Sequence, residues 1–178
     1  MYYIGIDIGG TKTLIALFTR RGRIIRRKKF RTPQGSNTFI RELENNLAVF
    51  TKYKVRSVVV AIPGVVQKNY SVSFGNRDWG NFDIFTPIKN LFNCPIYFEN
   101  DANLAAISEG YRLPGRTVFL TFSTGIGGGV VESGKILPGV VFEPGHRKYE
   151  YGGKTAEWED IAAASAIEKF YHIDPATD

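Results

Sequence analysis

A glycine turn between two strands near the start of the chain constrains the fold more than any other feature. Apolar isoleucines alternate with less apolar residues over 3–8, which is the periodicity of a β-strand, and Asp7 lies close to the end of this strand. The turn Gly9-Gly10-Thr11 follows, and the β-branched and apolar residues 13–18 predict a second strand directly after it. The Walker phosphate loop and the dinucleotide fingerprint are both followed by a helix, so this turn belongs to neither class.

The residues of this turn are suited to phosphate. Its glycines expose backbone N–H groups, and Thr11, Lys12 and Thr13 add hydroxyl and ammonium donors. Asp7 would repel a bare phosphate, so we expect a divalent cation such as Mg²⁺ between the two. The alternative is an ordinary Gly-Gly hairpin in which Asp7 hydrogen-bonds its own turn.

Composition and charge exclude several classes of function. The chain has 178 residues, of which 43% are hydrophobic, and it has no apolar run long enough to span a bilayer and no signal-peptide pattern. Cys94 is the only cysteine, which fits a reducing cytoplasm. The net charge of +6 comes largely from basic residues at 20–31, which we interpret as a charged edge strand rather than a nucleic-acid footprint. We therefore predict a cytoplasmic protein without nucleic-acid or membrane partners.

Strand and helix patterns alternate along the first two thirds of the chain. The continuous apolar run 57–62 predicts a strand buried on both faces, and it ends at the turn Pro63-Gly64. In α/β sheets, ligands bind beyond the carboxyl ends of such strands. The elements predicted from these patterns are strands at 2–8, 13–19, 23–30, 57–62 and 95–98 and helices at 39–50, 87–92 and 104–111.

Polar residues gather after the strand 95–98. Asp101 falls where this strand meets the next helix, so it is either the cap of that helix or a general base. Asn100 and Asn103 beside it offer hydrogen bonds to a hydroxylated substrate. Asn76 and Trp79 in the loop 68–83 line a polar cleft or, alternatively, form a turn with an anchoring indole.

The opening architecture recurs after Leu113-Pro114-Gly115, where we place a boundary between domains 1–114 and 115–178. A strand at 118–122 leads into the glycine turn 123–129 and then into another strand. Two such turns can close on one polyphosphate from opposite sides.

The last part of the chain offers a second group of polar residues. Glu143 and His146, separated by Pro-Gly, are a plausible hydroxyl-binding pair. A single helix is predicted from Glu157 to Tyr171, with acidic residues in its first turn.

Taken together, these motifs resemble the ROK family (repressor, open reading frame, kinase), a family of sugar kinases and sugar-responsive repressors. The resemblance covers nearly the whole chain, in register. It implies an α/β chain of the actin-like ATPase (ribonuclease H-like) fold, with a mixed sheet flanked by helices, the first domain complete and the second partial. It also implies residue roles: Asp101 as catalytic base; Asn76, Asn100, Asp101, Glu143, His146 and Glu159 at the sugar; Asp7, Gly9, Gly10, Thr11, Lys12, Thr124, Gly125, Gly127 and Gly128 at the phosphates; and Asp7 at the metal. Because the stretch after His146 is shortened, Glu157 is the alternative to Glu159 for the last sugar-binding role, and we favour Glu159.

The implied activity is glucokinase-like: transfer of a phosphoryl group from ATP, with Mg²⁺, to a hexose-type sugar. Family members carry a cysteine cluster that binds structural zinc, but Tyr149, Tyr151 and Ala156 stand near those positions, so we expect no structural zinc. The family also continues beyond this length, which suggests a fragment or a partner that supplies the rest. The alternative is a non-catalytic sugar sensor or degenerate member; no helix-turn-helix region precedes Gly5, which argues against DNA binding. Relatives are often dimers, so a homodimer is an open alternative.

Overall fold

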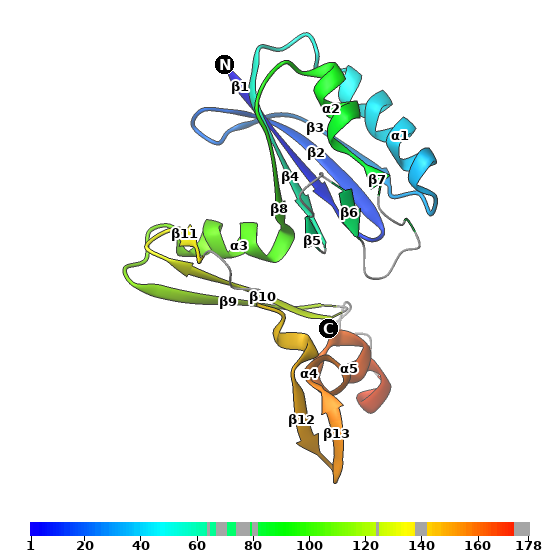
Figure 1. Cartoon of the computed structure of the whole chain (residues 1–178), viewed down its shortest axis with the longest axis vertical. Coiled ribbons are helices and arrows are strands. Elements are labelled where there is room, and N and C mark those ends of the chain that lie inside the picture. Colours follow the sequence, from blue (N-terminus) through cyan, green and yellow to red (C-terminus); the bar gives the residue numbers. More distant parts are fainter. Residues whose placement is uncertain are drawn as a thin grey trace. The chain divides into compact units, whose positions relative to one another are not determined.

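The chain forms two compact units, Met1–Asp101 and Ala102–Asp178, and each is described here by itself (Figure 1). The computed structural model describes residues 1–63, 65–66, 71–73, 79, 82–123, 125–137 and 142–172. Among these residues, no helix has the length and apolar character needed to cross a membrane.

The first unit is built on a five-stranded mixed sheet with the order β3-β2-β1-β4-β8. The first three strands form an antiparallel meander, whereas β4 is parallel to both β1 and β8. Helices α1 and α2 cover one face of this sheet (Figure 1). A second, small sheet has the order β5-β6-β7. The bounds are β1 Tyr2–Ile8, β2 Lys12–Thr19, β3 Ile24–Arg31, α1 Ser36–Ala48, β4 Val55–Ile62, β5 Val65–Val66, β6 Ser71–Ser73, β7 Phe82–Asp83, α2 Phe85–Leu91 and β8 Ile96–Asn100.

The core of the first unit lies between the sheet and its helices. The isoleucines of β1 are at most 1% exposed, because strand alternation directs them all to the helical side. Phe39 and Leu43 of α1 meet them with no exposed surface. Trp79 joins this core: its ring centroid lies 4.8 Å from that of Phe39, and its indole N–H donates to the Gln34 carbonyl. Of the two interpretations of Trp79, the anchoring indole is therefore confirmed.

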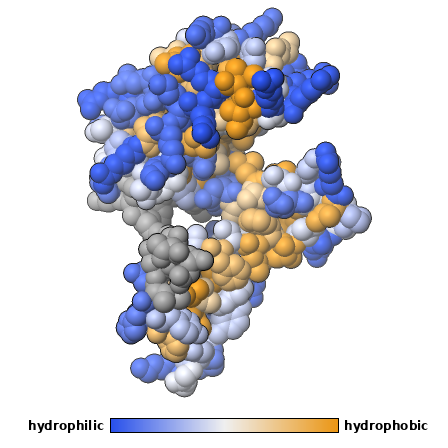
Figure 2. Space-filling model, turned by 180° about the vertical axis from the view of Figure 1, so that it is seen from behind, coloured by the Kyte–Doolittle hydropathy of each residue, from blue (hydrophilic) through white to orange (hydrophobic). Residues whose placement is uncertain are grey.

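The basic segment is an edge strand, as predicted. Strand β3 is the last strand on its side of the sheet, and Arg27, Lys29 and Arg31 are exposed along it. Hydrophilic side chains make up most of the surface of the first unit in the view of Figure 2. Charge along an exposed edge disfavours pairing with further strands.

The second unit contains a three-stranded antiparallel sheet, order β11-β10-β9, and a two-stranded hairpin of β12 and β13. Exposed apolar side chains alternate along β9, and the second unit shows a wide apolar area in Figure 2. The bounds are α3 Asp101–Gly110, β9 Arg116–Phe122, β10 Ile126–Glu132, β11 Lys135–Ile136, the 3₁₀ turn η1 Pro144–His146, β12 Lys148–Tyr151, β13 Lys154–Glu157, α4 Trp158–Ala162 and α5 Ala164–Tyr171.

The division between the units falls at the start of α3, whereas the sequence places the boundary after that helix, at 114/115. Close packing of α3 on β10 explains the difference. A Cβ added to Gly129 would lie 2.6 Å from the Cβ of Ala106 and 3.1 Å from the Ala102 carbonyl oxygen. The glycine lets the helix approach the strand, so α3 belongs to the second unit.

Two local predictions differ from the structure. The glycine turn predicted at 123–129 is shorter, because Gly127, Gly128 and Gly129 already pair with β9 as part of β10. The single helix predicted from Glu157 to Tyr171 is two helices, interrupted at Ala163. That residue is extended, with φ −76° and ψ 167°, and the N–H of Ala164 donates to the Ser123 carbonyl at 2.8 Å instead of continuing the helix.

Candidate functional site

The first glycine turn is a hairpin between β1 and β2, as predicted. The N–H of Gly9 donates to the Lys12 carbonyl at 3.0 Å, which closes the turn. A Cβ added to Gly10 would meet nothing within 4 Å. The phosphate-binding and ordinary-hairpin interpretations of this turn both stay predictions.

A pair of buried threonines fixes this turn from behind. The Thr32 hydroxyl donates to the Gly9 carbonyl at 2.8 Å, and the Thr32 N–H donates to the Thr11 carbonyl at 2.9 Å. The Thr13 hydroxyl lies 2.9 Å from the Thr32 hydroxyl, and neither residue is more than 3% exposed. The expectation that Thr13 offers a donor to phosphate is therefore wrong, because its hydroxyl is used inside the protein.

Thr32 is the structural residue that the sequence did not reveal. Thr32 begins the polar link after β3, and neither its residue type nor its neighbours in the sequence distinguish it from the other polar residues of that link. Only the pairing of β2 with β3, which places Thr13 opposite Phe30, brings Thr32 to the turn.

Two carboxylates gather at the carboxyl end of the first sheet. Asp7 lies on β1 and Asp101 directly follows β8, and both strands are parallel to β4 between them. Asp7 keeps an exposed surface, but partial desolvation by the surrounding chain and then the charge of Asp101 raise the pKa of its carboxyl above the ordinary value. Asn100 ends β8, and its N–H donates to Glu99 Oε1 at 2.9 Å. Asp101, the predicted base, and Asp7, the predicted metal ligand, therefore lie close enough to interact electrostatically.

The second glycine turn is short and tied to the helices that follow it. The N–H of Ser123 donates to the Gly125 carbonyl at 2.9 Å. The N–H of Ile126 donates to Glu159 Oε2 at 3.4 Å, and this oxygen lies 2.8 Å from the position of a Cβ on Gly125. A Cβ at 125 would therefore require the Glu159 side chain to move.

Two of the predicted phosphate residues lie in the strand after this turn. A Cβ on Gly128 would lie 2.6 Å from the Phe142 ring and 2.8 Å from the Phe119 carbonyl oxygen. A Cβ on Gly127 would lie 3.1 Å from the Thr121 methyl group. Packing accounts for both glycines, so their type alone is not a sign of phosphate binding.

His146 and two glutamates form a cluster within the second unit. His146 Nδ1 lies 2.9 Å from Glu157 Oε2 and 3.7 Å from Glu159 Oε1. The hydrogen bond with Glu157 is the main cause that raises the pKa of His146, and the charges of Glu159 and Glu143 add to it. Glu143 is exposed, directly before η1.

The ligand atoms of His146, Glu157 and Glu159 all lie within 4.8 Å of one another, a spacing that a cation can also bridge. The direct ion pair already accounts for this spacing. Tyr149 and Tyr151 on β12 supply neither thiolate nor imidazole, so the cysteine positions do not fit a zinc site.

The predicted site residues fall in both units. Asn76 and Thr124 lie outside the described residues. The joint action of the two glycine turns on one polyphosphate stays a prediction. The first unit holds Asp7, Gly9, Gly10, Thr11, Lys12, Asn100 and Asp101, and the second holds Gly125, Gly127, Gly128, Glu143, His146 and Glu159.

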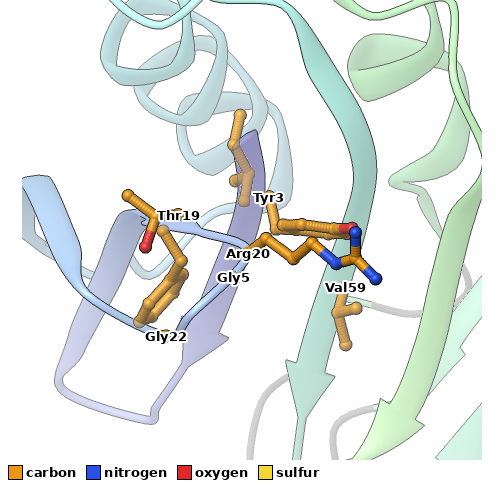
Figure 3. Close-up of a pocket in the computed structure, with 8 residues that line it drawn as sticks. Tyr3, Gly5, Thr19, Arg20, Gly22 and Val59 are labelled. Atoms are coloured by element: carbon orange, nitrogen blue, oxygen red, sulfur yellow. The ribbon is translucent and has the colours of Figure 1, made fainter. Parts of the chain in front are cut away.

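A shallow pocket of about 350 Å³ opens at the other end of β1, away from the glycine turn (Figure 3). Tyr3, Gly5 and Val59 contribute to it from the sheet, and Arg20 from the β2–β3 hairpin. Because the carboxylates lie at the opposite strand ends, this pocket is not part of the candidate site.

Known proteins resemble the chain in sequence and in fold. It is 33% identical over 153 residues to an N-acetylmannosamine kinase of Salmonella newport, which covers 82% of this chain and 53% of the relative. A ROK family glucokinase from Streptomyces griseus, solved with glucose and AMPPNP, superposes with a TM-score of 0.77 at 26% identity over 96% of this chain and 60% of its own. A ROK hexokinase from Thermus thermophilus gives 0.75 at 28% identity, with 95% and 62% coverage.

The chain spans about half the length of the curated relatives it matches. The similarity to the solved kinases confirms the predicted actin-like ATPase fold, with its mixed sheet flanked by helices. The sequence pattern of the ROK family matches residues 3–177, nearly all of the chain. The chain therefore belongs to the ROK family.

Proposed function

We propose that this chain carries the sugar site and phosphate-binding turns of an ATP-dependent sugar kinase that acts on a hexose-type sugar in the cytoplasm. The observation that carries the proposal is the position of Asp7 and Asp101 at the carboxyl ends of the parallel strands β1 and β8. Ligands of α/β sheets bind beyond these ends. Kinase relatives and the glycine turn next to Asp7 support the same conclusion.

Asp101 is the proposed general base. As a carboxylate at the start of α3, it accepts the proton of the sugar hydroxyl while the hydroxyl oxygen forms a bond to the γ-phosphorus of ATP. The bond between that phosphorus and the β–γ bridging oxygen breaks, and ADP leaves. A carboxylate is a weak base, which suffices when the transition state is loose and little charge develops on the nucleophile.

Asp7 is the residue best placed to hold a Mg²⁺ ion. A carboxylate whose pKa is raised by burial and by a second carboxylate suits a divalent cation, which neutralises both. When bound, Mg²⁺ neutralises charge on the phosphates. The exposed Thr11 and Lys12 and the backbone of Gly10 would contact the phosphates from the turn.

The sugar would be held by hydrogen bonds from several polar side chains. Asn100 ends the strand before the base and offers both an amide donor and an acceptor. Glu143, His146, Glu159 and Asn76 are the other proposed hydroxyl ligands. Gly125, Gly127, Gly128 and Thr124 would complete the phosphate site.

A panel of sugars tests the proposal. The protein that carries this chain is incubated with ATP, Mg²⁺ and one sugar at a time, including glucose, mannose and N-acetylmannosamine, and ADP release is measured. We expect sugar-dependent ADP formation and a phosphorylated sugar with at least one of them. ADP release at the same rate with and without every sugar would contradict the proposal.

A further inference from the structure

His146 is held through one of its two ring nitrogens. Its Nδ1 lies 2.9 Å from Glu157 Oε2, and a carboxylate can only accept, so Nδ1 carries the hydrogen. No hydrogen bond to Nε2 occurs in the parts of the chain that the structure describes. The side chain is 62% exposed, which leaves it accessible to a ligand.

Glu157 is itself fixed in place. It ends β13 and is the N-cap residue of α4, and its N–H donates to Asp160 Oδ2 at 3.4 Å. The neighbouring N–H of Trp158 donates to the Arg147 carbonyl at 2.9 Å, which ties the start of α4 to the residue after His146. This backbone hydrogen bond therefore connects the segment that carries His146 to the segment that carries Glu157.

Glu159 takes a different place in the same cluster. Its Oε2 accepts the N–H of Ile126 at 3.4 Å and lies 2.8 Å from the position of a Cβ on Gly145. Its Oε1 is 3.7 Å from His146 Nδ1, beyond hydrogen-bond distance. Glu159 thus contacts the second glycine turn, whereas Glu157 contacts the imidazole.

We propose that Glu157 is a positioning residue, which fixes the ring of His146 with hydrogen on Nδ1 so that Nε2 is directed to a hydroxyl of the substrate. This rests on the proposed sugar site. A neutral imidazole held in this tautomer accepts a hydrogen bond at Nε2, and a protonated one donates. Glu157, Glu159 and Glu143 are the charged groups around the ring, and all three favour the protonated form.

The first experiment reads the imidazole directly, in the chain itself and with EDTA present. Nitrogen-15 NMR reports the tautomer and pKa of His146, assigned with a His146→Gln variant, and the second histidine, His172, serves as internal reference. In Glu157→Ala we expect a lower pKa of His146 and a mixture of tautomers. Glu157→Gln should lower the pKa but keep the Nδ1–H tautomer, since its amide oxygen still accepts.

Glu150→Gln is the matched control, because Glu150 lies in the same hairpin and bonds Thr155 rather than His146. It should leave the His146 signals unchanged. Unchanged pKa and tautomer in folded Glu157→Ala would overturn the proposal. If Glu157→Ala does not fold, the pKa of His146 in the near-isosteric Glu157→Gln is the test. A lowered pKa supports the proposal, and an unchanged pKa overturns it.

The second experiment measures kinetics in the protein that carries this chain. Glu157→Ala should raise the KM for sugar by about tenfold, with little change in the KM for ATP. Glu157→Gln should recover much of this loss. An altered imidazole without any effect on sugar KM would also overturn the proposal. Sugar phosphorylation absent from the unsubstituted protein would instead contradict the proposed function, and the NMR result would still report on the ion pair.

Discussion

The buried hydroxyl of Thr13 lies 2.9 Å from that of Thr32 and donates to it, because the single hydrogen of Thr32 is used in its bond to the Gly9 carbonyl. This arrangement connects the first glycine turn to the end of β3 through two side chains with almost no exposed surface. These hydrogen bonds restrain the backbone of the turn at Gly9 and Thr11.

Removing either hydroxyl should destabilise the chain by different amounts. Thr32→Val leaves both the Gly9 carbonyl and the Thr13 hydroxyl without a partner and should lower the free energy of unfolding by about 2 kcal/mol. Thr13→Val leaves the bond to Gly9 intact and should lower it by about 1 kcal/mol. Urea unfolding of both variants and of the double variant measures this. The double variant should lose less than the sum; equal and additive losses would argue against the connected arrangement.

Replacing the proposed base should separate binding from chemistry. Asp101→Asn removes the proton acceptor but keeps the side-chain shape, so kcat for sugar phosphorylation should fall by about 10²- to 10⁴-fold. The dissociation constant for sugar, measured by calorimetry, should change by no more than about threefold. Glu109→Gln, which removes an exposed carboxylate from the same helix, is the control and should keep full activity. Normal turnover in Asp101→Asn would refute the role of base.

Replacing Asp7 should stabilise the unliganded chain and weaken its binding of Mg²⁺ with nucleotide. Because its pKa is raised in the folded chain, folding favours the protonated form, so this contribution is fully present below the ordinary pKa and is lost as pH rises through the raised one. At neutral pH, Asp7→Asn should therefore raise the Tm of the unliganded chain by about 1 °C, a small gain because solvent screens this exposed side chain. The gain should disappear in acid.

The same substitution should abolish binding of Mg²⁺ with nucleotide, since an amide is a poor ligand for this cation. Thermal melting across pH, with and without Mg²⁺ and ATP, measures both effects. A variant that is less stable at neutral pH, or that binds the nucleotide complex as well as the unsubstituted chain, would contradict the role given to Asp7.

Two glycines should respond to alanine in opposite ways. In Gly145→Ala, the new Cβ would lie 2.5 Å from the Ile126 carbonyl oxygen and 2.8 Å from Glu159 Oε2, so we expect a loss of about 1–3 kcal/mol in the free energy of unfolding. Gly10→Ala meets nothing within 4 Å and should unfold nearly as the unsubstituted chain does. Its nucleotide affinity should nevertheless fall, because the methyl group obstructs approach to the backbone. Full nucleotide binding by Gly10→Ala would show that the turn is not part of the phosphate site.

Strand and helix positions followed from local patterns. The alternation over β1 and the helical spacing of Phe39 and Leu43 predicted elements that the structure contains, because each pattern directs apolar side chains to one side. The break at Ala163 was not predictable in this way. It depends on Ser123, forty-one positions before the Ala164 N–H that it accepts.

The sequence by itself determined the family and the fold, and it predicted Asp7 near the end of a strand, Asp101 between a strand and a helix, and His146 in a loop. Those assignments depend on residue order and on periods of two or 3.6 residues, which a chain carries without folding. Tertiary structure decided which polar groups meet. The Thr13 hydroxyl is hydrogen-bonded to that of Thr32, Glu157 is hydrogen-bonded to His146, and Glu159 contacts the second glycine turn. Hydrogen bonds form over about 3 Å between residues distant along the chain, and this distance is set only when the elements pack.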